Sequence, residues 1–448
     1  MISNRKTGRW NLSHAVVGLF LLALSGSVVA QALPAEKGSV IFIHPDGSGA
    51  SMWNALRMFH YGPDSLSNWD RLDKMAMYRP HVLNSTNSSS HGGATIHSYG
   101  TKVMFNTYGN VPEKPVKSLS GKNKSIMHEA IEAGLATALV NSGHICEPGT
   151  GVFVASDKKR SNTDAISEQV IRSGVDVLFS GGEILLLPEG EVGRHGQPGR
   201  RKDGKNLIDL AKELGYQVVY TRDEMLALPN SVDKVLGVFA PYQTFNDKSE
   251  EHNKTHGLPL YWRYAPTVGE MIEKALQILE NKNQRFLLVL EEEGTDNFGN
   301  YNNAEGTLEA LRRADEAIGV AMGFVEDNPK TLIVTAADSD AGGFQMLAVR
   351  DSSKFDEPMP LIAWNGAACD GIHGSGTLPF VCAPDKNGVQ LRFGVAWSCY
   401  ADVAGAIIAR AHGLNSHLME NNFDNTDVYR MMYATLFGRL LPPYVRLN

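Results

Sequence analysis

Three strand-like hydrophobic runs in this chain lead directly into acidic residues. The runs and the acidic residues that follow them are 40–43 with Asp46, 286–290 with Glu291, Glu292, Glu293 and Asp296, and 332–334 with Asp338 and Asp340. In an open α/β sheet, ligands bind in the crevice beyond the carboxyl ends of the strands. Carboxylates gathered there repel one another unless a positive charge lies between them, and divalent metal ions usually supply it. The pattern therefore predicts a metal-dependent enzyme.

Hydrophobic runs alternate with longer amphipathic segments along most of the chain. The strand-like runs are 40–43, 136–140, 175–179, 235–239, 286–290, 332–334 and 360–363, and the helical patterns include 125–133, 268–280 and 304–325. This alternation predicts an α/β fold, a three-layer sandwich with a largely parallel central sheet and helices on both faces. The stretch 188–205 is rich in glycine and basic residues, and the stretch 221–264 shows no regular pattern. Together they predict a cap or insertion around 183–264.

The N-terminus has the pattern of a secretory signal peptide. Three basic residues precede an apolar segment at 15–29, and Ala30-Gln31-Ala32 has the small-x-small form of a cleavage site. A membrane anchor is the alternative, but the apolar run is shorter than the roughly 20 residues that a span needs. We expect a signal peptide over 1–32 with cleavage near Ala32, a catalytic domain over 33–448 without a membrane segment, and a periplasmic or secreted product.

The overall charge argues against nucleic acid as a partner. The 448 residues include 42 basic and 49 acidic ones, whereas nucleic-acid-binding domains carry a clustered excess of positive charge. Export would permit disulfides, and Cys369 and Cys382 are close enough in sequence to bridge a loop. Free buried thiols are the alternative for these two and for Cys146 and Cys399. No two cysteines form a CxxC pair, which argues against a structural zinc site.

A serine-rich loop at 84–100 runs into a segment with helical character. Serines commonly cap helix N-termini, which is the simplest interpretation of this segment. The helix N-terminus also favours anions and an ionising oxygen, so a serine there suits nucleophilic catalysis. Because no G-x-S-x-G elbow is present, a metal ion would have to activate such a serine.

Six motifs in order give the chain a resemblance to the alkaline phosphatase family. They are Asp46-Gly47-Ser48-Gly49 after the first run, Ser90 ahead of Gly100 and Lys102, Pro148 ahead of 158–160, Glu291 ahead of Asp296, the stretch 335–343, and His373 ahead of Pro379. Together they extend over roughly 38–415, most of the chain after the expected signal peptide. The resemblance implies an α/β phosphatase in which a serine attacks phosphate beside two or three divalent ions.

The resemblance also implies roles for particular residues. Ser90 would be the nucleophile, with Ser89, Ser88 or Thr86 of the same loop as alternatives. Lys158 or Arg160 would bind the phosphate. The planar guanidinium fork favours Arg160, whereas the family spacing favours Lys158. Grouped by ion, the implied ligands are Asp46, Asp338 and Ser339 or Asp340 beside Ser90; Asp296, Asn300 and His373; and Asp46, Glu147 and Glu291. Glu293 is an alternative to Glu291, because a strand turns both to the same face.

The chain departs from the family at several of these positions. Ser89, Glu147, Asn300 and Ser339 stand where the family has an aspartate, a threonine and two histidines. Oxygen ligands suit harder ions such as Mg²⁺, Mn²⁺ or Ca²⁺, whereas imidazole favours zinc. The resemblance implies Mg²⁺ and Zn²⁺ as cofactors, while these substitutions predict a weakened preference for zinc.

The expected reaction is metal-dependent hydrolysis of phosphate monoesters through a phosphoserine intermediate. The first alternative is a phosphodiesterase or a related hydrolase of the same superfamily. The second is a secreted protein that binds metal or phosphate without catalysis. Small phosphate esters are the expected partners, with no nucleic acid and no membrane, and a homodimer remains open.

Overall fold

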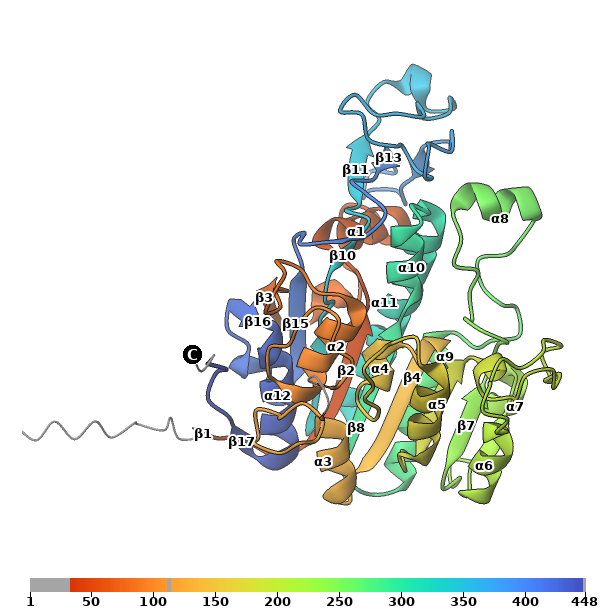
Figure 1. Cartoon of the computed structure of the whole chain (residues 1–448). Helices are drawn as coiled ribbons and strands as arrows, with labels where there is room; N and C mark the ends of the chain where they lie inside the picture. Colours follow the sequence, from red (N-terminus) through yellow and green to blue (C-terminus); the bar gives the residue numbers. More distant parts are fainter. Residues whose placement is uncertain (1–32, 111–113, 446–448) are drawn as a thin grey trace, which may run out of the picture. The chain divides into compact units, whose positions relative to one another are not determined.

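A ten-stranded sheet runs through the part of the chain that the computed structural model describes, residues 33–110 and 114–445 (Figure 1). The expected signal peptide at 1–32 lies outside these residues. The strand order is β16-β3-β15-β9-β2-β8-β4-β5-β7-β6. In that order the strands are Asn422–Asp424, Lys74–Arg79, Ile408–Gly413, Thr331–Thr335, Ser39–Pro45, Phe286–Glu292, Ala136–His144, Val177–Gly181, Val235–Val238 and Gln217–Val219.

The sheet is parallel apart from one strand. β15 pairs antiparallel with its neighbours β3 and β9, and the other pairings between strands of this sheet are parallel. The fold is therefore the predicted α/β sandwich with a largely parallel sheet. Parallel pairing also brings the carboxyl ends of β9, β2 and β8 to one edge, where ligands bind in folds of this class.

Helices connect the parallel strands, and many of them begin with a side-chain cap. They are α1 Ala50–Leu56, α2 Ser90–Tyr99, α3 Ile126–Glu132, α4 Pro148–Gly151, α5 Thr163–Arg172, α6 Leu207–Glu213, α7 Arg222–Leu226, α8 Glu250–His256, α9 Val268–Asn281, α10 Gly294–Asn300, α11 Ala304–Asp327 and α12 Asn425–Phe437. The helices predicted at 125–133, 268–280 and 304–325 are confirmed as α3, α9 and α11. Thr267 and Glu270 form a capping box that fixes the start of α9.

The central strands are hydrophobic because both of their faces are covered. All seven residues of β2 and of β8 are buried, as a parallel sheet between two helical layers requires. Val40 and Phe42 join one hydrophobic cluster with residues of α3, α5 and α12. Ile41 and Ile43 point to the other face and join a cluster with residues of α1, α9 and α11.

The residues between β9 and β15 form small sheets of their own. β10 (Asp340–Ala341) pairs with β14 (Asp402–Val403), and β13 (Arg392–Ala396) lies between β11 (Gln345–Ala348) and β12 (Phe380–Val381). β1 (Leu33–Pro34) and β17 (Arg439–Leu440) form a further antiparallel pair.

The strand predicted at 360–363 is wrong. Leu361 and Ile362 are 55% and 50% exposed, and Ile362 forms only an isolated bridge with Ala368. An apolar run outside the covered sheet gains little burial from an extended conformation, so hydrophobicity alone misled the prediction.

The stretch 183–264, expected as an insertion, also contributes to the main sheet. It supplies the strands β6 and β7 together with α6 and α7, and it ends in the segment that carries α8. The four cysteines are free thiols, so no bridge joins Cys369 to Cys382. Across the described ranges, no helix has the length and hydropathy that crossing a membrane requires.

Candidate metal and catalytic site

The acidic residues predicted from the sequence meet at the carboxyl edge of the sheet. β2 lies between β9 and β8, and His44 on β2 is opposite Glu291 on β8. The three strands end side by side, so Asp46, Glu291 and Asp338 lie at or just beyond the ends of neighbouring strands. All three are completely buried. Carboxylates from positions almost 300 residues apart thus share one dehydrated region.

Asp46 belongs to two groups of buried side chains that could each hold a metal ion. His44, Asp46 and Glu291 form the first group, and Asp46, Glu293 and Asp296 form the second. Within each group the ligand atoms lie within 4.8 Å of one another. Glu291 and Glu293 were alternatives in the sequence, and the structure places them in different groups. A shared carboxylate such as Asp46 is suited to bridging two neighbouring ions.

Asp296 lies on α10 and is linked to Asp402 of β14 through Asn300. Asn300 Nδ2 donates to both oxygens of Asp296 at 3.1 Å and to Asp402 Oδ1 at 2.9 Å. Asn300 Oδ1 accepts from the backbone N–H of Gly342 at 3.2 Å, so this amide presents its nitrogen to the carboxylates. Burial and the charge of Asp402 raise the pKa of Asp296 well above its usual range.

The loop after β9 packs Asp338 against the start of α2. A Cβ on Gly93 would lie 2.4 Å from Asp338 Cβ, so the absence of a side chain at Gly93 allows this close approach. Both oxygens of Asp338 and the hydroxyl of Ser339 are buried without a hydrogen-bond partner among the described residues. Asp340 is 5% exposed, and it lies so close to Gly49 that a Cβ there would overlap its carboxylate.

Ser90 is the first residue of α2 and is 5% exposed. Ser89 is the N-cap, and its hydroxyl accepts from the backbone N–H of Gly92 at 3.2 Å. Residues three apart on a helix share a face, so Ser90 lies on the same face as Gly93. Because that face packs on Asp338, Ser90 begins a helix that lies against the acidic cluster.

The cluster is suited to binding divalent cations, because several of its buried carboxylate oxygens have no hydrogen-bond partner. Neither carboxylate oxygen of Asp46, Glu293 or Asp338 has a hydrogen-bond partner within the described part of the chain. Burial, together with the charge of Asp46, raises the pKa of Glu291 to about 8. Burial and nearby carboxylates also raise the pKa values of Glu293 and Asp338 well above their usual range. Bound cations would remove the repulsion that causes these shifts.

His44 supplies part of the missing positive charge. Its Nε2 lies 3.2 Å from Asp46 Oδ1, and both side chains are completely buried. Burial acts to lower the pKa of His44, but the charge of Asp46 outweighs it and raises the pKa to about 9. Burial alone would raise the pKa of Asp46, which the charge of His44 lowers instead. One imidazolium does not balance the remaining carboxylates of the cluster.

Arg160 approaches the cluster from a cavity of about 670 Å³. Its Nη2 donates to Glu147 Oε2 at 2.6 Å and lies 4.0 Å from Glu293 Oε1. Burial would raise the pKa of Glu147, but the charges of His144 and Arg160 lower it to about 2. The cavity is lined in part by His91, His144, Lys158, Lys159, Arg160, Tyr242 and Asn297.

Residues that adjoin Ser90 and Asp296 in the sequence line this cavity. His91 directly follows Ser90, and Asn297 directly follows Asp296. Both sequence candidates for the phosphate clamp, Lys158 and Arg160, line it, and Arg160 contacts the carboxylates. An anion in this cavity would therefore meet basic side chains on one side and the start of α2 on the other.

Four of the implied acidic and histidine ligands lie outside the two groups, namely Asp338, Asp340, Glu147 and His373. Two residues at the site were not predicted. Glu147 is held by Arg160, and His373 is exposed; neither belongs to the groups that could hold a metal. His44 and Asp402 were missed. No hydrophobic run precedes Asp402, so the sequence held no signal for it. A signal existed for His44, because residues two apart on a strand, such as His44 and Asp46, lie on the same face.

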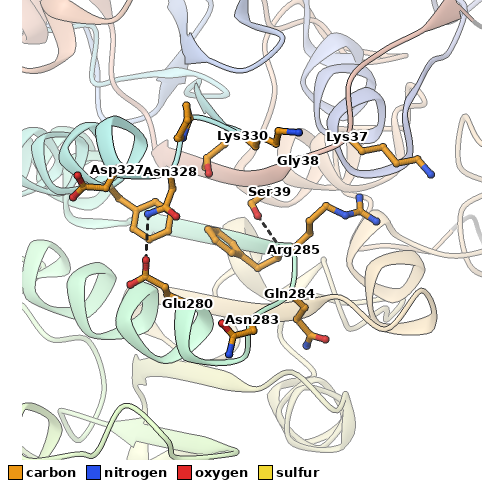
Figure 2. A pocket seen from close by; sticks show the side chains of 14 residues that line it. Lys37, Gly38, Ser39, Glu280, Asn283, Gln284, Arg285, Asp327, Asn328 and Lys330 are labelled. Atoms are coloured by element: carbon orange, nitrogen blue, oxygen red, sulfur yellow. Dashed lines mark hydrogen bonds between the residues drawn. The ribbon is translucent and has the colours of Figure 1, made fainter.

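A second cavity, of about 550 Å³, lies at the opposite edge of the sheet (Figure 2). Ser39, Arg285 and Lys330 line it at the amino ends of β2, β8 and β9. Its polar groups include the backbone N–H of Phe286, which donates to Ser39 Oγ at 3.2 Å. The acidic cluster is at the carboxyl ends, where ligands bind in α/β sheets, so it is the candidate active site of the two.

Comparison with known proteins identifies the family. A sequence model described as "Alkaline phosphatase" matches residues 37–367. Alkaline phosphatase 4 of Bacillus subtilis is 25% identical over 337 residues, which are 72% of this chain and 66% of that protein. The repressible alkaline phosphatase of Saccharomyces cerevisiae is 25% identical over 362 residues, 73% of this chain and 60% of that protein. The chain thus spans less than two thirds of the length of these relatives.

Solved structures agree with this assignment at the level of the fold. Alkaline phosphatase from the Antarctic bacterium TAB5 has a TM-score of 0.66 at 18% identity, covering 90% of this chain and 99% of that one. The Thermus thermophilus enzyme has a TM-score of 0.69 at 21% identity, covering 92% and 94%. With a sequence model that matches most of its length, the chain belongs to the alkaline phosphatase family.

Proposed function

We propose that the protein hydrolyses phosphate monoesters in a metal-dependent reaction in which Ser90 attacks phosphorus and is transiently phosphorylated. The observation that carries the proposal is the packing of α2 on Asp338 through Gly93. This packing supports a position for Ser90, at the helix N-terminus, close to a cluster of buried, unpartnered carboxylates. Membership of the alkaline phosphatase family supports the same chemistry.

The residues present would hold two or three divalent ions. Asp46, Asp338 and Ser339 would bind one beside Ser90, Asp296 and Asp402 would bind another, and Asp46 with Glu291 or Glu293 would bind a third. Such ions lower the pKa of an attacking hydroxyl and neutralise charge that develops on the departing oxygen. Because most of these donors are oxygens, we propose Mg²⁺ or Mn²⁺ rather than Zn²⁺ at the two positions nearest the serine.

The chain itself supplies positioning and charge for the reaction. The start of α2 presents backbone N–H groups to an anion, which favours both the ionised serine and the phosphate. Arg160 would donate two parallel hydrogen bonds to the phosphate oxygens once it turns from Glu147. The hydroxyl of Ser90, nearly buried, would be shielded from bulk water while the ester binds in the cavity.

A direct test compares wild type with Ser90→Ala and with Thr86→Ala, an exposed residue of the same loop. Metal-loaded wild type and Thr86→Ala should release phosphate from p-nitrophenyl phosphate at equal rates. Ser90→Ala should be slower by at least about 10³-fold, because the covalent route is lost. Equal rates for the wild type and Ser90→Ala would refute Ser90 as nucleophile.

A second candidate function is favoured by Asn300, which presents its amide nitrogen to Asp296 and Asp402. A protein that binds metal or phosphate without turnover would tolerate that arrangement. Stoichiometric phosphate binding without ester hydrolysis, in wild type loaded with Mg²⁺, Mn²⁺ or Zn²⁺, would support this candidate. Faster hydrolysis of the bis-ester than of the monoester would instead identify a diesterase.

We also propose that the protein is exported. The support is the basic, apolar and small-residue pattern of 1–32, which matches a cleavable signal peptide. N-terminal sequencing of the protein recovered outside the cytoplasm should begin near residue 33.

A further inference from the structure

We propose that His44 is a metal ligand, so that the group His44, Asp46 and Glu291 forms a nitrogen-containing site within the acidic cluster. The inference rests on the metal dependence proposed above and adds a donor that the comparison with the family did not supply. It also predicts which ion each position prefers.

The tautomer of His44 leaves one ring nitrogen available to a metal. His44 Nδ1 lies 2.7 Å from the backbone oxygen of Ala336. A carbonyl oxygen only accepts, so Nδ1 must carry a hydrogen and donate it. Nε2 then faces Asp46, whose Oδ1 lies 3.2 Å away, and a bound ion would take the place of the proton that Nε2 carries in the metal-free protein. Nε2 has no other hydrogen-bond partner among the described residues. A histidine whose Nδ1–H is held by a backbone carbonyl is the arrangement that orients Nε2 ligands in metal sites.

The fold fixes the direction of this ring. His44 and Asp46 are two residues apart at the end of β2, so their side chains lie on one face. The pairing of β2 with β8 places His44 opposite Glu291. The ring also packs against Phe42 and His97, with ring centroids 5.9 Å and 5.3 Å away. These contacts aim Nε2 at the carboxylates instead of at solvent.

One bound cation would account for several unpartnered atoms together. Nε2 of His44 and both oxygens of Asp46 have no hydrogen-bond partner in the described ranges. An ion pair between the two residues would occupy one oxygen of Asp46, at 3.2 Å, and would leave the other unused. His44, Asp46 and Glu291 can each offer one atom within 4.8 Å of the other two, which is close enough for a single ion.

The inference predicts that different metal ions prefer different positions in the cluster. Among the ligands proposed for the three ions, His44 is the one imidazole. Zinc and cobalt favour imidazole, whereas magnesium and manganese favour carboxylate oxygens. Zinc should therefore bind most tightly at the His44 position and not at the oxygen-lined positions beside Ser90.

The test uses the full-length protein freed of metal and titrated with Zn²⁺ alone against a chromophoric chelator. His44→Gln should weaken the tightest zinc site by at least about tenfold, as loss of ligand support does. His195→Gln is the matched control, since a ring nitrogen of His195 also bonds to a backbone carbonyl, that of Val238 at 2.7 Å, and His195 belongs to neither metal group. The control should retain the wild-type zinc affinity. Unchanged zinc binding in His44→Gln would overturn the inference.

A second variant gives a positive readout that does not depend on losing a ligand. In His44→Cys, zinc K-edge absorption should show a Zn–S distance of about 2.3 Å in place of one Zn–N distance of about 2.0–2.1 Å. Wild type has four cysteines and serves as the reference for their contribution. A spectrum without Zn–S scattering in a folded, zinc-loaded His44→Cys protein would contradict the assignment.

These measurements are independent of catalysis. A protein that binds zinc through His44 but hydrolyses no ester would support the inference and end the proposed function. An active phosphatase whose zinc spectrum lacks imidazole would retain the function and overturn the inference.

Discussion

Gly93 sets the distance between the helix that carries Ser90 and the aspartate beside it. A Cβ at Gly93 would lie 2.4 Å from Asp338 Cβ and 2.7 Å from Asp338 Oδ2, whereas ordinary contact begins at 3.4 Å. The shorter distance falls 1.0 Å below that limit. Because both partners are buried, the side chains have little room to yield, and α2 must move instead. Gly93→Ala should therefore displace Ser90 by about 1 Å relative to Asp338.

The expected cost of that displacement is large in rate and small in stability. A misplacement of about 1 Å at an active site costs about 10²-fold in rate, which equals about 2.7 kcal/mol of activation free energy. Overpacking costs about 1–3 kcal/mol of stability, but replacing glycine by alanine within a helix returns about 1 kcal/mol. The variant should remain folded while kcat/KM falls by about two orders of magnitude.

The assay measures kcat/KM for p-nitrophenyl phosphate and thermal unfolding of the same metal-loaded preparations. Gly323→Ala is the matched control, because Gly323 is exposed on α11 and a Cβ there would meet nothing within 4 Å. It should keep the wild-type rate and gain up to about 1 kcal/mol of stability. The reasoning is refuted if folded Gly93→Ala keeps kcat/KM within about threefold of wild type.

Three further changes test other parts of the site and its surroundings. Arg160→Ala should lower kcat/KM for the monoester by about 10²-fold, the usual cost of removing one charged donor. Arg160→Lys should restore only part of this kcat/KM, because lysine keeps the charge but cannot donate two parallel hydrogen bonds as the guanidinium does. Asp402→Ala should weaken metal binding by about 10–100-fold in a titration that measures bound ions. Asp209→Ala, at an exposed position of α6, is the control and should leave metal binding unchanged. Burial and Glu250 raise the pKa of buried Asp370 well above its usual range, so the folded state holds a proton that the unfolded state releases. Stability should fall as pH rises through that raised pKa, and Asp370→Asn should lessen the fall in a series of thermal midpoints; a wild-type slope in the variant would contradict this.

The central sheet was predictable because its strands are buried on both faces. Continuous hydrophobic runs in the sequence correspond to the strands β2, β4, β5, β7, β8 and β9. β3 has exposed and buried residues mixed, with Met75 and Met77 exposed, so no comparable signal marked it. The run at 360–363 shows the reverse error, since hydrophobic residues there are exposed. Burial is a property of the assembled fold, and a local window reports it only where both faces are covered.

The site was predictable where acidic residues end such strands. Asp46 and Asp338 were found because each follows a buried run, and the parallel sheet brings those ends together. Asp402 was not found because β14 has two residues and pairs only with β10. Its place beside Asp296 depends on that antiparallel pair and on the amide of Asn300. Contacts made through short, irregular connections leave no periodic pattern in the sequence.

The division between carboxylate and imidazole donors follows from where the chain places its histidine. Replacing neutral imidazoles by the amide of Asn300 and the hydroxyl of Ser339 leaves the carboxylates of the cluster in place, so their mutual repulsion still has to be balanced by bound cations. The raised pKa values of Glu291, Glu293 and Asp338 reflect their burial and this uncompensated negative charge. The charge of His44 lowers the pKa of Asp46, the carboxylate that both groups share, and counteracts the rise at Glu291. A nitrogen donor at the shared residue therefore influences two ion positions, while the positions nearest Ser90 keep oxygen donors and the harder ions that these prefer.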